Sequence, residues 1–75
     1  MYIIVVGGGR VGYYLAKELV ESGHEVLIIE KDGGKSERIA EDLGDIVLRG
    51  DGCDAATMEM AGFSRADMVI AVTGD

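Results

Sequence analysis

The stretch MYIIVVGGGRVG, residues 1–12, decides the fold of this chain. Tyr2 to Val6 is an apolar run rich in β-branched residues, which is typical of a buried strand. Gly7, Gly9 and Gly12 follow as G-x-G-x-x-G, and a helical pattern begins at once. A strand, a glycine turn and a helix in this order are the context that the dinucleotide-binding motif requires.

Each glycine of the motif has a physical role in such a turn. Gly7 permits the tight bend, Gly9 lets the main chain approach a pyrophosphate, and Gly12 lets the helix pack closely on the strand. The free N–H groups and the positive end of the helix dipole then face the anion. The alternative is a tight strand-to-helix turn that binds nothing.

The pattern continues with alternating helices and strands. A helix is expected from about Arg10 to Ser22, with Val11, Leu15 and Leu19 on one face and Gly23 ending it. A second strand follows at Val26–Ile29 and ends at Glu30. Its continuous apolar run is typical of a parallel sheet covered on both faces.

The second half of the chain predicts two more strands. Asp32 is the expected N-cap of a helix at Lys35–Leu43, whose first turn is weakened by Gly33 and Gly34. The remaining elements are a strand at Asp45–Arg49, a short helix at Ala55–Ala61 capped by Asp54, and a strand at Met68–Val72. Right-handed crossovers then give a Rossmann-like α/β fold with strand order 3-2-1-4 and helices on both faces.

Length and composition limit the function classes. The 75 residues are expected to form a single domain (1–75), the N-terminal part of a fold truncated after the fourth strand. A net charge of −7 argues against nucleic acid or anionic lipid as a direct partner. No apolar run approaches the ~20 residues of a membrane span, so no direct membrane insertion is expected. The single cysteine fits a reducing cytoplasm.

Glu30 is the candidate for binding a ribose. It lies 18 residues after Gly12, close to the spacing at which dinucleotide-binding folds place an acid on the ribose hydroxyls. A carboxylate repels a 2′-phosphate, so NAD is favoured over NADP, although Lys31 partly offsets the charge. The alternative is an exposed acid that faces Lys31 or Lys35.

A third candidate region combines Asp51–Cys53 with Thr73 and Gly74, at the carboxyl ends of two further strands. Asp51 alternatively caps a turn, and Cys53 by itself is expected to be a small buried side chain. The chain offers no metal-ligand pair and no acid/base group placed for hydride transfer, so neither a metal site nor an enzyme is predicted.

Five segments together resemble one family: IIVVGGGRVGYYLAKEL, VLIIEKD, LRGDGCD, the short helix ending MAGF, and ADMVIAVTGD. In this order they look like the N-terminal nucleotide-binding module of potassium transport regulators, the TrkA-N family, also called KTN or RCK-N. The resemblance places nucleotide contacts on Gly7, Gly8, Gly9, Arg10, Val11, Glu30, Asp51, Gly52, Cys53, Thr73 and Gly74. It implies no calcium ligand at Thr73, because relatives that bind calcium carry an acid there.

The resemblance also implies a mechanism and partners. The module would bind NAD(H), or alternatively ATP or ADP, on the cytoplasmic side of a potassium-translocating membrane protein and control its gating. It would be peripheral to the inner face of the membrane and form homo-oligomers in the full-length protein. A different interpretation is the cofactor half of an NAD-dependent dehydrogenase whose substrate domain is absent.

Overall fold

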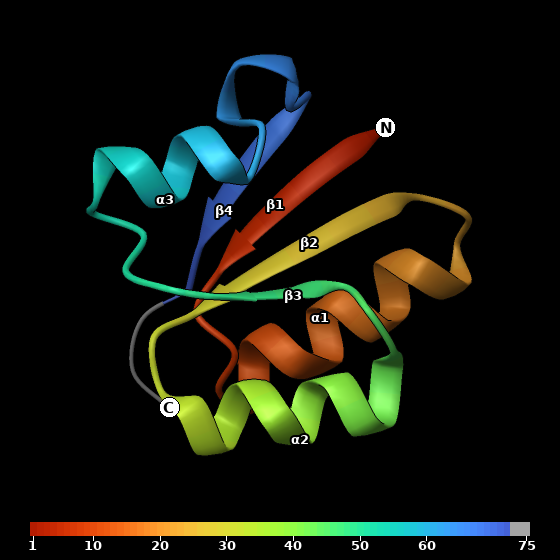
Figure 1. Cartoon of the computed structure of the whole chain (residues 1–75). Helices are drawn as coiled ribbons and strands as arrows, with labels where there is room; N and C mark the ends of the chain where they lie inside the picture. Colours follow the sequence, from red (N-terminus) through yellow and green to blue (C-terminus); the bar gives the residue numbers. More distant parts are fainter. Residues whose placement is uncertain (73–75) are drawn as a thin grey trace.

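The apolar run at the start of the chain forms the centre of a four-stranded parallel sheet. A computed structural model describes residues 1–72. The elements in chain order are β1 (Tyr2–Val6), α1 (Arg10–Glu21), β2 (Glu25–Glu30), α2 (Gly33–Leu43), β3 (Val47–Arg49), α3 (Ala55–Met60), the 3₁₀ turn η1 (Phe63–Arg65) and β4 (Met68–Ala71). The strand order β3-β2-β1-β4 confirms the predicted Rossmann-like topology (Figure 1).

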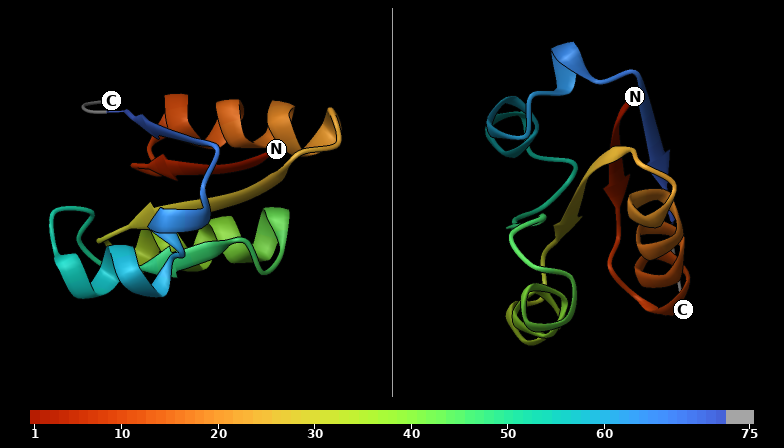
Figure 2. Two further views of the ribbon diagram at one scale, coloured as in Figure 1. Left: turned by 90° about the horizontal axis from the view of Figure 1, so that it is seen from above. Right: turned by 90° about the vertical axis from the view of Figure 1, so that its right-hand side faces the viewer.

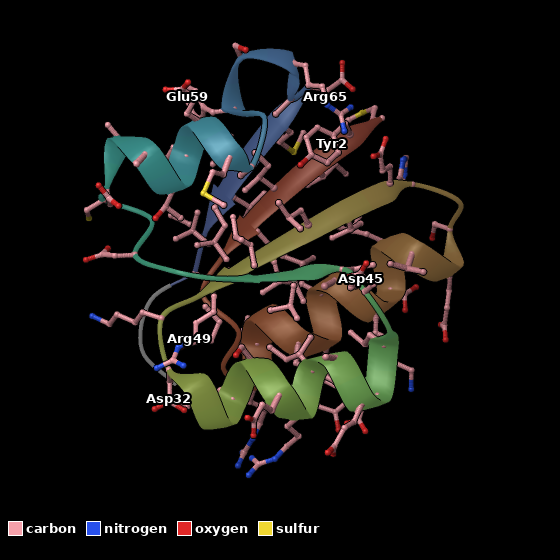
Figure 3. The ribbon with its side chains drawn as sticks, in the orientation of Figure 1. Tyr2, Asp32, Asp45, Arg49, Glu59 and Arg65 are labelled. Carbon is pink, nitrogen blue, oxygen red and sulfur yellow. The ribbon has the colours of Figure 1, made fainter. Side chains whose placement is uncertain are left out.

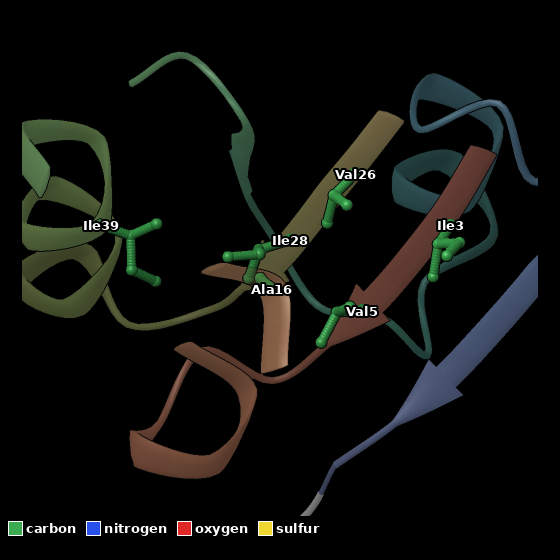
Figure 4. Packing of buried hydrophobic residues seen from close by; sticks show 6 residues of the cluster. All are labelled: Ile3, Val5, Ala16, Val26, Ile28 and Ile39. Atoms are coloured by element: carbon green, nitrogen blue, oxygen red, sulfur yellow. The ribbon is translucent and has the colours of Figure 1, made fainter. Parts of the chain in front are cut away.

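Helices cover both faces of the sheet, as predicted (Figure 2). On one face, alternate residues of β1 and β2 pack with Ala16 of α1 and Ile39 of α2 (Figure 4). On the other face, Tyr2, Ile4 and Ile29 pack with Ala61, which directly follows α3. The strands β1 and β2 are therefore buried on both sides, which explains their unbroken apolar sequence.

The face that α1 turns toward the sheet agrees with the prediction at Leu19, which packs against the core, but differs from it at Val11. Val11 is 58% exposed, and the fully buried positions of the helix are Gly12 and Ala16. A Cβ on Gly12 would lie 1.9 Å from the carbonyl oxygen of Gly7. This backbone contact fixes the rotation of the helix, and it turns Val11 toward solvent.

Helix α2 begins earlier than expected. The sequence predicted a start at Lys35 because Gly33 and Gly34 are poor helix formers, yet both belong to the first turn. The Asp32 carboxylate accepts a hydrogen bond of 2.8 Å from the Lys35 N–H, so the predicted N-cap is confirmed. A cap of this kind stabilises a helix by about 1 kcal/mol, enough to offset a glycine in the first turn.

Smaller differences concern the second half of the chain. β3 begins at Val47 rather than Asp45, and η1 was not predicted. Asp54 occupies the N-cap position of α3, but its carboxylate accepts a hydrogen bond from the Thr57 hydroxyl instead of a backbone N–H. The remaining predicted bounds agree with the structure to within one residue.

We predict that Gly12→Ala destabilises the chain far more than Gly23→Ala. The methyl group of the first variant would collide with backbone, which costs about 3 kcal/mol or more. Gly23 has φ +92° and open space within 4 Å of the position a methyl would take, so its alanine costs only about 1 kcal/mol of backbone strain. Urea unfolding measures both values, and equal losses would contradict the close packing of α1 on β1.

Candidate functional site

The glycine turn lies where the carboxyl ends of three strands meet. Val6, the last residue of β1, is aligned with Ile29 of β2 and with Ala71 of β4. Gly7 follows with φ +109°, and its N–H donates to the Ile29 carbonyl oxygen over 2.8 Å. A Cβ at Gly7 would lie 2.2 Å from the carbonyl oxygen of Val72, so only glycine fits this bend.

Glu30 points from the end of β2 into this turn. Its side chain is buried, with 7% of the residue exposed, so the alternative of an exposed acid facing lysines is wrong. Oε1 accepts a hydrogen bond of 2.7 Å from the Gly8 N–H, and Oε2 accepts one of 2.8 Å from the Asp32 N–H. The carboxylate therefore connects the glycine turn to the residue that caps α2.

The bonds of Glu30 leave acceptor capacity for a ligand. An ionised carboxylate has about four lone-pair sites, and the two N–H groups occupy one on each oxygen. Each oxygen can accept one more hydrogen bond from a hydroxyl. Two further acceptor sites on one rigid carboxylate suit a vicinal diol such as that of a ribose.

Gly8 is essential to this arrangement, although the G-x-G-x-x-G motif leaves its position open. A Cβ there would lie 2.4 Å from Ile39 Cδ1 and 3.2 Å from Glu30 Oε1. Any side chain at Gly8 would push apart α2 and the carboxylate. The sequence signal was the run of three glycines, which leaves no bulky residue beside the acid.

The amino end of α1 faces the same turn. Gly9 is its N-cap in an extended conformation and, being a glycine, has no side chain with which to cap the helix. The first intrahelical bond runs from the Tyr13 N–H to the Gly9 carbonyl oxygen over 2.8 Å. The first N–H groups of an α-helix have no acceptor within the helix, and the positive end of the dipole lies there. Such an end is suited to a phosphate.

A groove of about 390 Å³ extends from the turn between α1 and α2. Its lining residues are Gly8, Gly9, Arg10, Tyr13, Tyr14, Lys35, Arg38, Ile39 and Asp42. Three of these side chains are cationic and one is acidic, so the groove is basic in a chain whose net charge is −7. Lys35 and Arg38 were not predicted; their spacing of three residues on a helix was the available signal.

Two tyrosines, Tyr13 and Tyr14, lie along this groove in different environments. Tyr13 packs against the core, whereas Tyr14 is 60% exposed. Their rings meet edge to face with centroids 5.0 Å apart. Partial burial raises the pKa of the Tyr13 phenol, and the nearby Asp42 carboxylate raises it further. The phenol is therefore neutral at physiological pH and adds no negative charge.

The loop after β3 forms a turn beside the end of β1. Asp51 Oδ1 accepts a hydrogen bond of 2.9 Å from the Cys53 N–H, so Asp51 does cap a turn. A Cβ on Gly52 would lie 2.5 Å from Val6 Cγ1, which brings the loop against the last residue of β1. Cys53 is exposed, so its predicted burial is wrong: the turn directs it away from the core.

The structure thus describes only part of the set of site residues that the sequence predicted. The turn residues 7–11, Glu30 and the loop 51–53 meet at one edge of the sheet. Thr73 and Gly74 lie outside the described residues. Within residues 1–72 no three metal-ligating side chains lie close together. None of the helices in this part of the chain has both the length and the apolar character needed to cross a membrane.

A second hollow, of about 410 Å³, lies at the opposite end of the strands. Arg65 forms one wall, paired with Glu25 over 3.0 Å and placed 3.9 Å above the Tyr2 ring (Figure 3). The Tyr2 hydroxyl donates to the Ala61 carbonyl oxygen, and burial raises the pKa of this phenol. These polar groups are satisfied by one another, so the glycine turn remains the candidate site.

Comparisons with known proteins identify a family for this chain. The family model of the TrkA-N domain matches residues 3–75. A Trk system potassium uptake protein TrkA homolog of Methanothermobacter thermautotrophicus is 41% identical over all of this chain and 35% of its own length. A homolog of the same name from Pyrococcus abyssi is 39% identical over 99% of the chain and 33% of its own.

A bacterial relative shows the same extent of similarity. The Trk system potassium uptake protein TrkA of Streptomyces coelicolor is 36% identical over 97% of this chain and 33% of its own length. The chain thus spans about a third of these relatives. Since the family model covers nearly every residue and the sheet has the strand order that the fold requires, the chain belongs to the TrkA-N domain family.

Proposed function

We propose that this chain is an NAD(H)- or adenine-nucleotide-binding regulatory domain of a potassium uptake system or channel. The observation that carries the proposal is the buried Glu30 carboxylate, held 2.7 Å from the Gly8 N–H at the mouth of the glycine turn. An acid in this position, beside a helix that begins at a glycine N-cap, combines an acceptor for a sugar diol with a binding site for phosphate. Membership of the TrkA-N family supports the same interpretation.

We infer the binding roles of the residues from this geometry and from the family resemblance. The backbone of residues 7–11 would hold the diphosphate at the amino end of α1, and Glu30 would accept the ribose hydroxyls. The loop Asp51–Cys53 would border the adenosine half of the ligand. Thr73 and Gly74 are included from the family resemblance, and they lie outside the described residues.

The same acid favours NAD(H) over NADP(H). Glu30 already accepts two N–H bonds that fix its position, so it cannot turn away from an incoming 2′-phosphate. A phosphate within hydrogen-bond distance of a buried carboxylate brings two like charges together in a poorly solvated place. A 2′-hydroxyl instead donates a hydrogen bond to it.

We propose a binding rather than a catalytic role. The turn presents mainly backbone N–H groups, and the chain's single histidine, His24, precedes β2 and so lies at the opposite end of that strand from Glu30. The relatives are named as potassium uptake proteins. The proposed partner is a potassium-translocating membrane protein, with the domain peripheral to the inner face of the membrane and homo-oligomeric in the full-length protein.

Regulation requires that the ligand distinguish two arrangements of the assembly. A nucleotide can shift transport only by its differential affinity for the two states. The two members of a ligand pair, NADH and NAD or ATP and ADP, would differ in their relative affinity for the two states.

We predict that calorimetry detects NADH binding to this chain and that Glu30→Ala weakens it by about 1–3 kcal/mol, the cost of losing the ribose hydrogen bonds. NAD and ATP are titrated alongside, and NADPH is expected to bind more weakly than NADH. Glu37→Ala is the matched control, since this acid is exposed on α2. Absence of binding by all four nucleotides would refute the proposed function.

We also predict that Glu30 stabilises the folded chain in the absence of any ligand. Removing it in Glu30→Ala leaves the Gly8 and Asp32 N–H groups without their acceptor and lowers the free energy of unfolding by about 1–3 kcal/mol. Glu37→Ala should change it by less than about 0.5 kcal/mol. Thermal and urea unfolding measure both variants, and equal stabilities would show that the two bonds of Glu30 contribute nothing.

A further inference from the structure

Arg49 ends β3 directly beside the acid of the proposed site. The strand register aligns it with Glu30, and the Gly50 N–H donates to the Glu30 carbonyl oxygen over 3.0 Å. Val47, two residues earlier, packs into the cluster beneath α1 and α2, so Arg49 projects from the same face of the sheet. Figure 3 shows its side chain next to Asp32 at the start of α2.

The guanidinium group lies flat over Gly33. A Cβ built on Gly33 would lie 2.9 Å from the central carbon Cζ of Arg49, and 3.1 and 3.2 Å from its two terminal nitrogens. If this Cβ position lay in the plane of the guanidinium group, it would be nearer to a nitrogen than to Cζ, which is the reverse of what is found. The group therefore turns one face toward the Gly33 backbone, and the missing side chain of Gly33 makes room for it.

The opposite face of the guanidinium is directed away from Gly33. Arg49 is exposed, and within residues 1–72 it forms no ion pair and no hydrogen bond. Gly34, the next residue of α2, has no side chain to cover it. A planar cation supported from behind by backbone thus stands one strand away from the buried carboxylate.

We propose that Arg49 is the platform on which the adenine ring of the ligand stacks. This inference rests on the proposed function, because it places the ribose on Glu30. The base is bonded to that ribose, so it must lie within a few ångströms of the acid, where neighbouring strands are about 4.8 Å apart. A guanidinium stacks on aromatic faces through cation–π and dispersion attraction, and a lysine ammonium lacks the plane to do so.

Ligand fragments separate this role from a general effect of charge. We expect Arg49→Ala to weaken the binding of NADH and of AMP by about tenfold, the scale of one base–side-chain stack. Binding of nicotinamide mononucleotide, which carries no adenine, should not change. Arg49→Lys should lose nearly as much as Arg49→Ala, and Lys17→Ala, which removes the same charge from the exposed side of α1, should lose nothing.

The glycine behind the platform provides a second test that leaves Arg49 in place. A methyl group in Gly33→Ala occupies the space 2.9 Å from Cζ and displaces the guanidinium, so AMP binding should weaken by about fivefold. In Gly34→Ala the nearest atom is Asp32 Oδ2 at 3.4 Å, an ordinary contact, and binding should be unchanged. Both alanines improve helix propensity and should raise the melting temperature, so a folding defect cannot explain the difference.

Calorimetry on the 75-residue chain decides the inference. If wild-type NADH binding is strong but Arg49→Ala or Arg49→Lys binds NADH and AMP as tightly, the platform is refuted while the proposed function stands. If only NADPH binding falls in Arg49→Ala, the residue holds a 2′-phosphate and the stacking role is wrong. If the wild-type chain binds none of the nucleotides, the proposed function fails first, and the platform fails with it.

Discussion

The hydrogen bond between the Glu30 carboxylate and the Gly8 N–H is the interaction on which the candidate site depends. Burying a carboxylate is unfavourable unless its oxygens are satisfied, and here both accept backbone N–H groups. Such charge-assisted bonds are stronger than neutral ones. They require a residue without a side chain at Gly8, and they require α2 to begin early enough for Asp32 to lie above the acid. One buried charge thus sets the local geometry of a turn, a strand end and a helix start.

A second constraint is the contact between Gly12 and the carbonyl of Gly7, which holds α1 against the end of β1. Because no side chain separates the two backbones, the helix cannot rotate to bury Val11, and Ala16 faces the sheet instead. The same rotation leaves Arg10 and Tyr14 on the groove beside the turn. The closeness of one glycine contact therefore decides which side chains the proposed ligand would meet.

The sequence alone was sufficient for the strand order, the presence of helices on both faces and the glycine turn, because these follow from apolar runs and from residues with a single steric option. It was insufficient where a contact joins distant parts of the chain. Val11 looks inward by periodicity, yet a backbone contact decides otherwise, and Cys53 looks buried by residue type, yet the Asp51 turn exposes it. The flat contact of Arg49 with Gly33 links a strand end to a helix start, which no local pattern encodes.

The position of Glu30 also bears on the regulatory role proposed for this domain. Its two oxygens are bonded to different elements, one to the glycine turn and one to the cap of α2. A ligand bound to the remaining lone pairs would be connected to the glycine turn, to β2 and to the start of α2 through a single rigid group. Ligands that fill the site differently would then stabilise the start of α2 to different extents. Such a difference would be coupled to a partner protein if the partner's surface responds to the state of this helix. An acid on a flexible loop would offer the same acceptors to the proposed ligand but would have no comparable connection to the helices.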